Sequence, residues 1–299
     1  METIEKILTK LSPTDPPAAM PIWSRIARER QAAKKQQSEQ GTTQPQPSTI
    51  EEPQYRCSKC RDLEFVPAGD GAFTFCECRK QRMLERRIKS SHIDPAFTGA
   101  TFKNYKLLPH NTKMLAMARK YVAEFQAIRK ERNNSLGFLA KMGESSIKEI
   151  RDPVQRAAVK AKHNSYGMGK THLLSAVALT LLHSGVQVLL VNDADIVAEL
   201  RQGQFAEDNE HFEKLIGSIE RVELLIWDDL GKAKTTEWVL NQYYRIINYR
   251  YRMGLPTCFT SNEDMDTLAE KIGDATASRL FAMCRGRLLR CEGPDYRLA

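Results

Sequence analysis

From about residue 105 onward, the pattern of apolar and polar positions predicts alternating helices and strands. Apolar side chains at helical spacing predict helices over residues 111–130, 170–183, 195–202, 212–219 and 237–252. Short apolar runs predict strands over residues 135–140, 186–192, 222–229 and 256–261. Because helices and strands alternate, we expect an α/β domain over residues 93–299, with helices on both faces of a parallel sheet. Ligands of such sheets bind outside the carboxyl ends of the strands.

The N-terminal part of the chain has a different pattern. Apolar residues on one helical face predict a short amphipathic helix over residues 1–12. Residues 13–53 are rich in Pro, Gln, Ser, Thr and Ala and lack the apolar side chains of a folded core, which predicts a disordered linker. Neither a stretch of ~18 apolar residues nor a signal-peptide pattern is present, so we expect a cytoplasmic protein without a membrane partner.

Four of the seven cysteines lie in one short window and suggest a metal site. They form the close pairs Cys57/Cys60 and Cys76/Cys78, with an aromatic and glycine-bearing stretch between them that is typical of a small hairpin. Such a hairpin folds one pair of thiolates onto the other, as in zinc sites. Disulfides, which are rare in the cytosol, and incidental thiols are the alternatives. We therefore predict a zinc-binding module over residues 54–92.

Basic residues follow the second cysteine pair and predict a charged helix over residues 79–87. The whole chain carries a formal charge of +8, which makes nucleic acid a natural partner, although excess Lys and Arg also serves solubility. The helix can bind DNA phosphates or an acidic protein, or it is only a solvated surface. Charge alone leaves these alternatives open.

Two motifs together predict a nucleoside triphosphate site. Gly167, Gly169, Lys170 and Thr171 precede or begin a predicted helix, where a glycine turn and backbone N–H groups can wrap phosphates. Downstream, an apolar strand ends in Asp228-Asp229, and such carboxylates hold magnesium. Either motif alone is weak because each occurs by chance. Their order and spacing together favour a P-loop ATPase.

Residues 141–164 interrupt the expected path from the strand at 135–140 to the phosphate loop. The first glycine of a G-x4-G-K-T loop falls at position 164, which is Asn164. Joining Ala140 to Ser165 restores a strand and loop, so residues 141–164 are interpreted as a charged insertion with a short helix starting at Pro153. The insertion either projects as a peripheral excursion or displaces the loop and blocks nucleotide binding.

Five separated motifs, in the family's order, resemble AAA+ helicase loaders of the DnaC/DnaI type. They are Gly169-Lys170-Thr171-His172-Leu173-Leu174, Trp227-Asp228-Asp229-Leu230-Gly231, Pro256-Thr257-Cys258-Phe259-Thr260-Ser261-Asn262, Ser278-Arg279-Leu280-Phe281 and Asp295-Tyr296-Arg297. The four-cysteine module resembles the N-terminal parts of phage and Gram-positive members of this family. Transposition helper ATPases of the IstB type share the core motifs.

The resemblance implies roles for the motif residues. Lys170 would contact the β- and γ-phosphates, and Thr171 and Asp228 would hold magnesium. Asp229 stands where many AAA+ proteins have glutamate as the base, and its shorter side chain implies slow hydrolysis. Asn262 would sense the γ-phosphate.

Two arginines would complete the nucleotide site. Arg279 resembles the arginine finger that acts on a neighbouring subunit's nucleotide, and Arg297 resembles the second sensor arginine.

The resemblance also implies a function. An AAA+ P-loop NTPase of this type would use ATP and Mg2+, oligomerise through its AAA+ interfaces, grip single-stranded DNA and deliver a replicative hexameric DNA helicase. The amphipathic helix and the Zn2+ module would hold the helicase. Two alternatives remain from the sequence: an IstB-like ATPase that assists a transposase, and a non-catalytic adaptor whose phosphate loop is disabled by the insertion.

Overall fold

The computed structural model describes residues 55–69, 71–204 and 209–295. Residues from Cys57 onward form one compact unit. The short helix predicted over residues 1–12, the linker predicted over residues 13–53 and Arg297 lie outside the described residues.

A five-stranded sheet forms the centre of the larger domain. Its strands are β3 (Leu136–Ala140), β4 (Val188–Asn192), β5 (Leu224–Asp228), β6 (Thr257–Thr260) and β7 (Leu288–Cys291). The order across the sheet is β4-β5-β6-β3-β7, and every pairing is parallel. Parallel strands need crossover helices, which accounts for the alternation in the sequence. The predicted α/β fold with a parallel sheet flanked by helices is confirmed.

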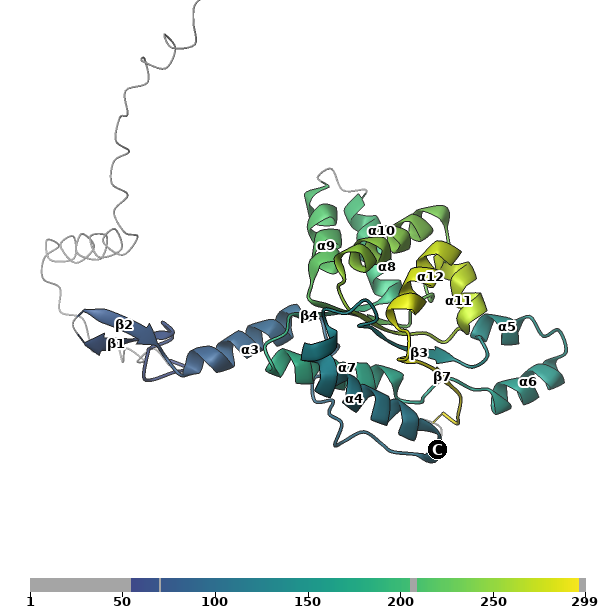
Figure 1. The fold of residues 1–299 in the computed structure, drawn as a ribbon, viewed down its shortest axis with the longest axis horizontal. Helices are drawn as coiled ribbons and strands as arrows, with labels where there is room; N and C mark the ends of the chain where they lie inside the picture. The colour runs from purple at the N-terminus through teal and green to yellow at the C-terminus, as the bar shows by residue number, and fades with distance from the viewer. Residues whose placement is uncertain (1–54, 70, 205–208, 296–299) are drawn as a thin grey trace, which may run out of the picture. The chain divides into compact units, whose positions relative to one another are not determined.

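Helices cover both faces of this sheet (Figure 1), and an apolar core lies on each face. On one face pack α4 (Thr112–Ile128) and α7 (Lys170–His183). On the other face pack α8 (Asp193–Gln204), α9 (Glu210–Arg221), α10 (Glu237–Met253), α11 (Met265–Ile272) and α12 (Asp274–Met283). Successive residues of a strand point to opposite cores, as Phe138 and Leu139 of β3 do. The central strands β3 and β5 are buried along their whole length, as is typical of parallel sheets covered by helices on both faces.

The predicted helices and strands of this domain agree with the structure apart from their ends. The short helix α5 (Glu144–Lys148) in the inserted segment was not predicted. The short strand β7 and the helices α11 and α12 were not predicted. Helix α11 does carry a sequence signal, because the Asp264 side chain accepts hydrogen bonds from the first-turn N–H groups of Asp266 and Thr267. None of the helices in the described part of the chain combines the length and apolar character needed to cross a bilayer.

The inserted segment forms two short helices between β3 and the phosphate loop. They are α5 (Glu144–Lys148) and α6 (Pro153–Lys162), which contact each other (Figure 1). Asp152 caps α6 by accepting from the Val154 N–H, and Pro153 occupies the first turn, where no donor is needed. Helix α5 buries Ile147, whereas α6 buries none of its residues. Helix α6 therefore contributes little apolar burial to the stability of the domain.

The cysteine-rich segment contains the expected hairpin and helix. Strands β1 (Phe65–Gly69) and β2 (Ala72–Phe75) pair in antiparallel fashion, and α3 (Cys78–Ser90) follows them. Leu84 and Ile88 of α3 pack against the core that contains α4 and α7. Two single-turn helices, η1 (Pro95–Phe97) and η2 (Pro109–Asn111), connect α3 to α4.

Candidate nucleotide and metal sites

The phosphate loop has the backbone geometry that its glycines predict. Gly167 and Gly169 have φ angles of 61° and 79°, in the left-handed region that glycine adopts without a steric penalty. A side chain at Gly169 would also collide with the ring of Tyr105, whose hydroxyl donates to the Met168 carbonyl oxygen over 2.8 Å. Helix α7 begins at Lys170 directly after this turn, so its unpaired N–H groups are available to an anion.

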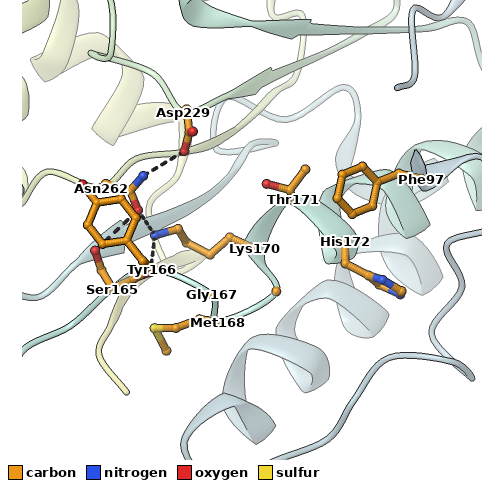
Figure 2. A pocket seen from close by; sticks show the side chains of 11 residues that line it. Phe97, Ser165, Tyr166, Gly167, Met168, Lys170, Thr171, His172, Asp229 and Asn262 are labelled. Carbon is orange, nitrogen blue, oxygen red and sulfur yellow. Dashed lines mark hydrogen bonds between the residues drawn. The ribbon is translucent and has the colours of Figure 1, made fainter. Parts of the chain in front are cut away.

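Lys170 points into the site and is only 7% exposed (Figure 2). Its ammonium group donates to the Ser165 carbonyl oxygen over 2.9 Å and to Asn262 Oδ1 over 2.6 Å. Both of these acceptors are neutral, and the Lys170 charge also acts on the nearby carboxylate of Asp228, whose pKa burial raises and Lys170 lowers.

Asp228 lies at the carboxyl end of β5 and is held by two threonines. Thr171 Oγ1 donates to both carboxylate oxygens, over 3.2 and 2.9 Å, and Thr260 Oγ1 donates to Oδ1 over 2.6 Å. Burial raises the pKa of Asp228, and the charge of Asp229 raises it further. A divalent cation would favour the ionised form of this buried carboxylate. A carboxylate beside a threonine hydroxyl supplies the oxygen ligands that magnesium prefers.

Asp229 and Asn262 meet at the edge of the same site. Asn262 Nδ2 donates to Asp229 Oδ1 over 3.0 Å (Figure 2), and the Asp229 N–H donates to Thr260 Oγ1 over 2.9 Å. Asp229 has a φ of 54°, which is uncommon for a residue with a side chain. Strained backbone of this kind persists where the surroundings fix it, often at functional sites.

These side chains surround a cavity of about 160 Å3 that is also lined by Phe97 and His172. A second cavity of about 530 Å3 shares Phe97 and Thr171 with it and is also lined by Asp228. The structure therefore brings together Gly167, Gly169, Lys170, Thr171, Asp229 and Asn262 around one cavity, with Asp228 hydrogen-bonded to Thr171.

Asn164 takes the place of the first glycine without disturbing the loop. Its Oδ1 accepts from the Tyr166 N–H over 3.2 Å, and its Nδ2 donates to the carbonyl oxygens of Tyr166 and Gly293, each over 2.8 Å. The Gly293 N–H donates to the Asn164 carbonyl oxygen over 2.8 Å. The insertion thus ends in an asparagine turn that ties the loop to the segment after β7.

Comparison with known proteins identifies the domain that contains this site. The family model described as "IstB-like ATP binding protein" matches residues 154–293. The chain carries an IstB/DnaC-like ATP-binding domain. The match includes the phosphate loop, Asp228 and Asp229 at the end of β5, Asn262 and Arg279.

Related proteins resemble more of the chain than the IstB/DnaC-like domain alone. The chain is 26% identical over 264 residues to the "Phage-like element PBSX protein XkdC" of Bacillus subtilis, covering 84% of this chain and 88% of the relative. It is 24% identical over 201 residues to the "Replicative helicase loader DnaC" of Escherichia coli, covering 66% of this chain and 69% of the relative. The solved structure titled "Crystal structure of the DnaC helicase loader" shares the fold, with a TM-score of 0.51 and 19% identity, and the match covers 67% of this chain and all of that one.

Arg279, one of the two arginines that the resemblance implicates, lies in the IstB/DnaC-like domain away from the phosphate loop. Arg279 lies on α12 and donates to the Ala275 carbonyl oxygen over 2.7 Å, and its guanidinium carbon lies 5.2 Å from the centre of the Tyr244 ring. It does not line the phosphate cavity. Asp295, from the closing motif that contains Arg297, lies close enough to Gly167 to exclude a side chain there.

Sequence reasoning missed several residues of this site. Thr260 holds both aspartates, and a signal for it existed, because it ends the strand next to the Asp228 strand. Ser165 and Tyr105 contact the loop through a carbonyl oxygen and a hydroxyl group. No motif indicated Tyr105, which lies 63 residues before Met168 in the sequence.

The four clustered cysteines have the geometry of a metal centre. The Sγ atoms of Cys57, Cys60, Cys76 and Cys78 all lie within 4.8 Å of one another. Cys57 and Cys76 are 3.8 Å apart, and Cys60 and Cys78 are 3.4 Å apart. Four sulfurs bound tetrahedrally at about 2.3 Å from zinc lie about 3.8 Å apart, so the cluster fits this metal.

Two thiols of the cluster have pKa values shifted in opposite directions, and burial raises the pKa of Cys78 to about 12. A hydrogen bond from the Cys60 backbone lowers the pKa of the Cys57 thiol to about 7, which favours the thiolate that binds metals. The remaining cysteines, Cys258, Cys284 and Cys291, are buried in the domain cores. They are core residues, as their apolar surroundings in the sequence suggest.

Proposed function

We propose that this protein is an ATP-dependent loader that places a replicative hexameric DNA helicase on single-stranded DNA. The observation that carries the proposal is the assembled site, where Lys170, Thr171, Asp229 and Asn262 line one cavity beside Asp228. Relatives named replicative helicase loaders support the choice of partner.

Nucleotide binding would rearrange the hydrogen bonds around Lys170. The ammonium group would leave Ser165 and Asn262 for the β- and γ-phosphates, while the first N–H groups of α7 would donate to the phosphate oxygens. Thr171 and Asp228 would hold magnesium, which supplies charge neutralisation when bound. Asn262, released from Lys170, would be free to contact the γ-phosphate or the attacking water.

Asp229 would orient the attacking water and accept its proton. Asn262 Nδ2 fixes the Asp229 carboxylate by a hydrogen bond of 3.0 Å, and the short aspartate side chain limits its reach. We therefore expect slow hydrolysis, which suits a switch that turns over once for each loading event. Arg279 of one subunit would complete the site of the next, so that hydrolysis depends on self-association. Arg297 would act as the second sensor arginine.

The proposal predicts helicase binding and ATP-dependent loading. With the host's hexameric helicase, the full-length protein should co-elute in gel filtration and should raise the amount of helicase recovered on circular single-stranded DNA when ATP is present. Loading onto single-stranded circles, measured by sedimentation of DNA-bound helicase, should exceed loading onto duplex circles. Absence of a helicase complex at micromolar concentrations would rule out the loader function.

A transposase-assisting ATPase is the second candidate, because the family model that matches is IstB-like. It would bind duplex DNA and a transposase in place of single-stranded DNA and a helicase. The same loading experiment separates the two, since preference for duplex DNA together with no helicase binding favours the second candidate.

We also propose that the four-cysteine cluster holds one Zn2+ and that the surrounding module helps to hold the helicase. The double variant Cys60→Ser/Cys76→Ser should lose the zinc measured by elemental analysis and weaken helicase binding about tenfold or more, since structural zinc contributes directly to folding of a small module. Its ATP affinity should stay within about twofold of wild type because the nucleotide cavity contains no cysteine. Cys258→Ala, which alters a buried thiol outside the cluster, should keep its zinc. A double variant with full zinc content would contradict this assignment.

A further inference from the structure

A groove lies between the inserted helices and the phosphate loop. Two adjoining cavities of about 390 and about 620 Å3 share the lining residues Glu144, Ala157, Lys160, Asn164 and Tyr166. Each volume lies in the range of ligand pockets, and each cavity is larger than the phosphate cavity next to it. The groove is therefore large enough for one unit of a polymeric ligand.

The groove carries two positive charges without partners. Arg156 and Lys160 lie one turn apart on α6 and both line the groove, and neither side chain forms a hydrogen bond or ion pair with any described residue. Lys148 and Lys232 also line it, but both pair with Glu144, over 2.5 and 3.6 Å. Like charges one turn apart destabilise a helix, and α6 has no buried residue. Lys160 lies in the last turn of α6, where a cation is favourable, whereas Arg156 lies outside that turn.

Tyr166 connects the groove to the nucleotide site. Its side chain lines the phosphate cavity and both cavities of the groove, and Figure 2 shows it beside Ser165 and Asn262. Its hydroxyl group is buried and has no hydrogen-bond partner among the described residues, which is a cost that a ligand can remove. An aromatic ring beside unpaired cations is the combination that single-stranded nucleic acids bind, through stacking and phosphate contacts.

Hydrogen bonds connect the residues around the groove to Asn262, the residue proposed to contact the γ-phosphate. The Glu144 N–H donates to the Asn262 carbonyl oxygen over 3.0 Å, and Ser145 N–H and Oγ both donate to Glu263, each over 3.0 Å. At the other end of the insertion, Asn164 holds the backbone of Tyr166. A ligand in the groove would therefore contact elements that are hydrogen-bonded to the residues lining the nucleotide site, so binding at one site would influence the other.

We propose that this groove is a second phosphate site, which takes a backbone phosphate of single-stranded DNA on Arg156 and Lys160 beside the Tyr166 ring. The choice of single-stranded DNA rests on the proposed function, whereas the site itself rests on the groove. The insertion is then a working part of the DNA-binding surface rather than an inert excursion or a block.

The test is the salt dependence of binding to a fluorescent oligothymidylate, measured by anisotropy with the full-length protein and no helicase. Arg156→Gln/Lys160→Gln should weaken binding about tenfold or more at low salt and lower the slope of log K against log salt by about 1.4, for two lost phosphate contacts. The charge-preserving variant Arg156→Lys/Lys160→Arg should bind within about threefold of wild type. Both double variants change only exposed residues of α6, so circular dichroism should show that they fold as the wild type does.

A matched control removes the same charge from the opposite end of the sheet. Arg132 and Arg252 are exposed and precede the amino ends of β3 and β6, and Arg132→Gln/Arg252→Gln should leave the slope within about 0.3 of wild type. Equal losses in the groove and control variants would overturn the groove site.

The ATP affinity of the groove variant distinguishes a phosphate of the DNA backbone from a phosphate of free nucleotide as the ligand of the groove. A groove variant that loses ATP affinity while its DNA binding is unchanged would assign the groove to free nucleotide and overturn the proposal. Because no helicase is present, failure of helicase loading overturns the proposed function without affecting the groove result.

Discussion

Lys170→Ala should weaken binding of Mg-ATP about a hundredfold or more, as measured by titration calorimetry. The Lys170 side chain is nearly buried, and its ammonium group donates hydrogen bonds to Ser165 and Asn262 near the N-terminus of α7. When ATP binds, charged phosphate oxygens would replace these two neutral acceptors. Charge-assisted hydrogen bonds contribute about 1.5–3 kcal/mol each, and losing two gives an effect of at least this size. The variant should fold, because the two released acceptors border a cavity that water can enter.

A surface lysine provides the control for this experiment. Lys214 on α9 is 70% exposed and pairs only with Glu210 one turn earlier, so Lys214→Ala should bind ATP as wild type does. Unchanged binding by Lys170→Ala would contradict the assignment of the phosphate loop. Absence of binding by the wild type would favour the non-catalytic adaptor and remove the ATP-dependent part of the proposed function.

Most of the nucleotide site could be predicted because its residues occupy the ends of periodic elements. Asp228 ends one buried strand and Asn262 follows the next, and carboxyl ends of parallel strands meet at one edge of the sheet. Lys170 and Thr171 follow the glycine turn that begins α7. The linear order of such motifs is enough to bring them together once the sheet is parallel.

Other features depend on contacts that the order of residues does not encode. The edge strand β7 has only four residues, and its partner, β3, lies far away in the sequence, so its apolar pattern is too short to identify. Asn164 substitutes for a loop glycine through its own side-chain hydrogen bonds, which no spacing rule anticipates. The path of the insertion likewise could not be predicted, because it depends on hydrogen bonds from its two ends to Asn262 and Gly293.

Arg250→Met should destabilise the domain by about 4 kcal/mol or more, a large share of the roughly 5–15 kcal/mol typical of a folded domain. Arg250 on α10 is completely buried, and burial lowers its pKa to about 9, so the guanidinium remains charged at neutral pH. Its donors satisfy neutral acceptors: the carbonyl oxygens of Ile219, Glu220, Val222 and Pro256, and Thr257 Oγ1.

The size of this effect follows from the buried acceptors that Arg250→Met leaves without a donor. Methionine keeps much of the apolar volume, but every one of these acceptors loses its Arg250 donor at the junction of α9, α10 and β6. Urea unfolding followed by circular dichroism measures the loss, with Arg252→Met, an exposed position on the same helix, expected to change stability by less than about 0.5 kcal/mol. Equal stability of the two variants would mean that the Arg250 bonds do not hold the junction. Because β6 leads to Thr260 and Asn262, a loosened junction should also lower ATP affinity, unlike the exposed substitution.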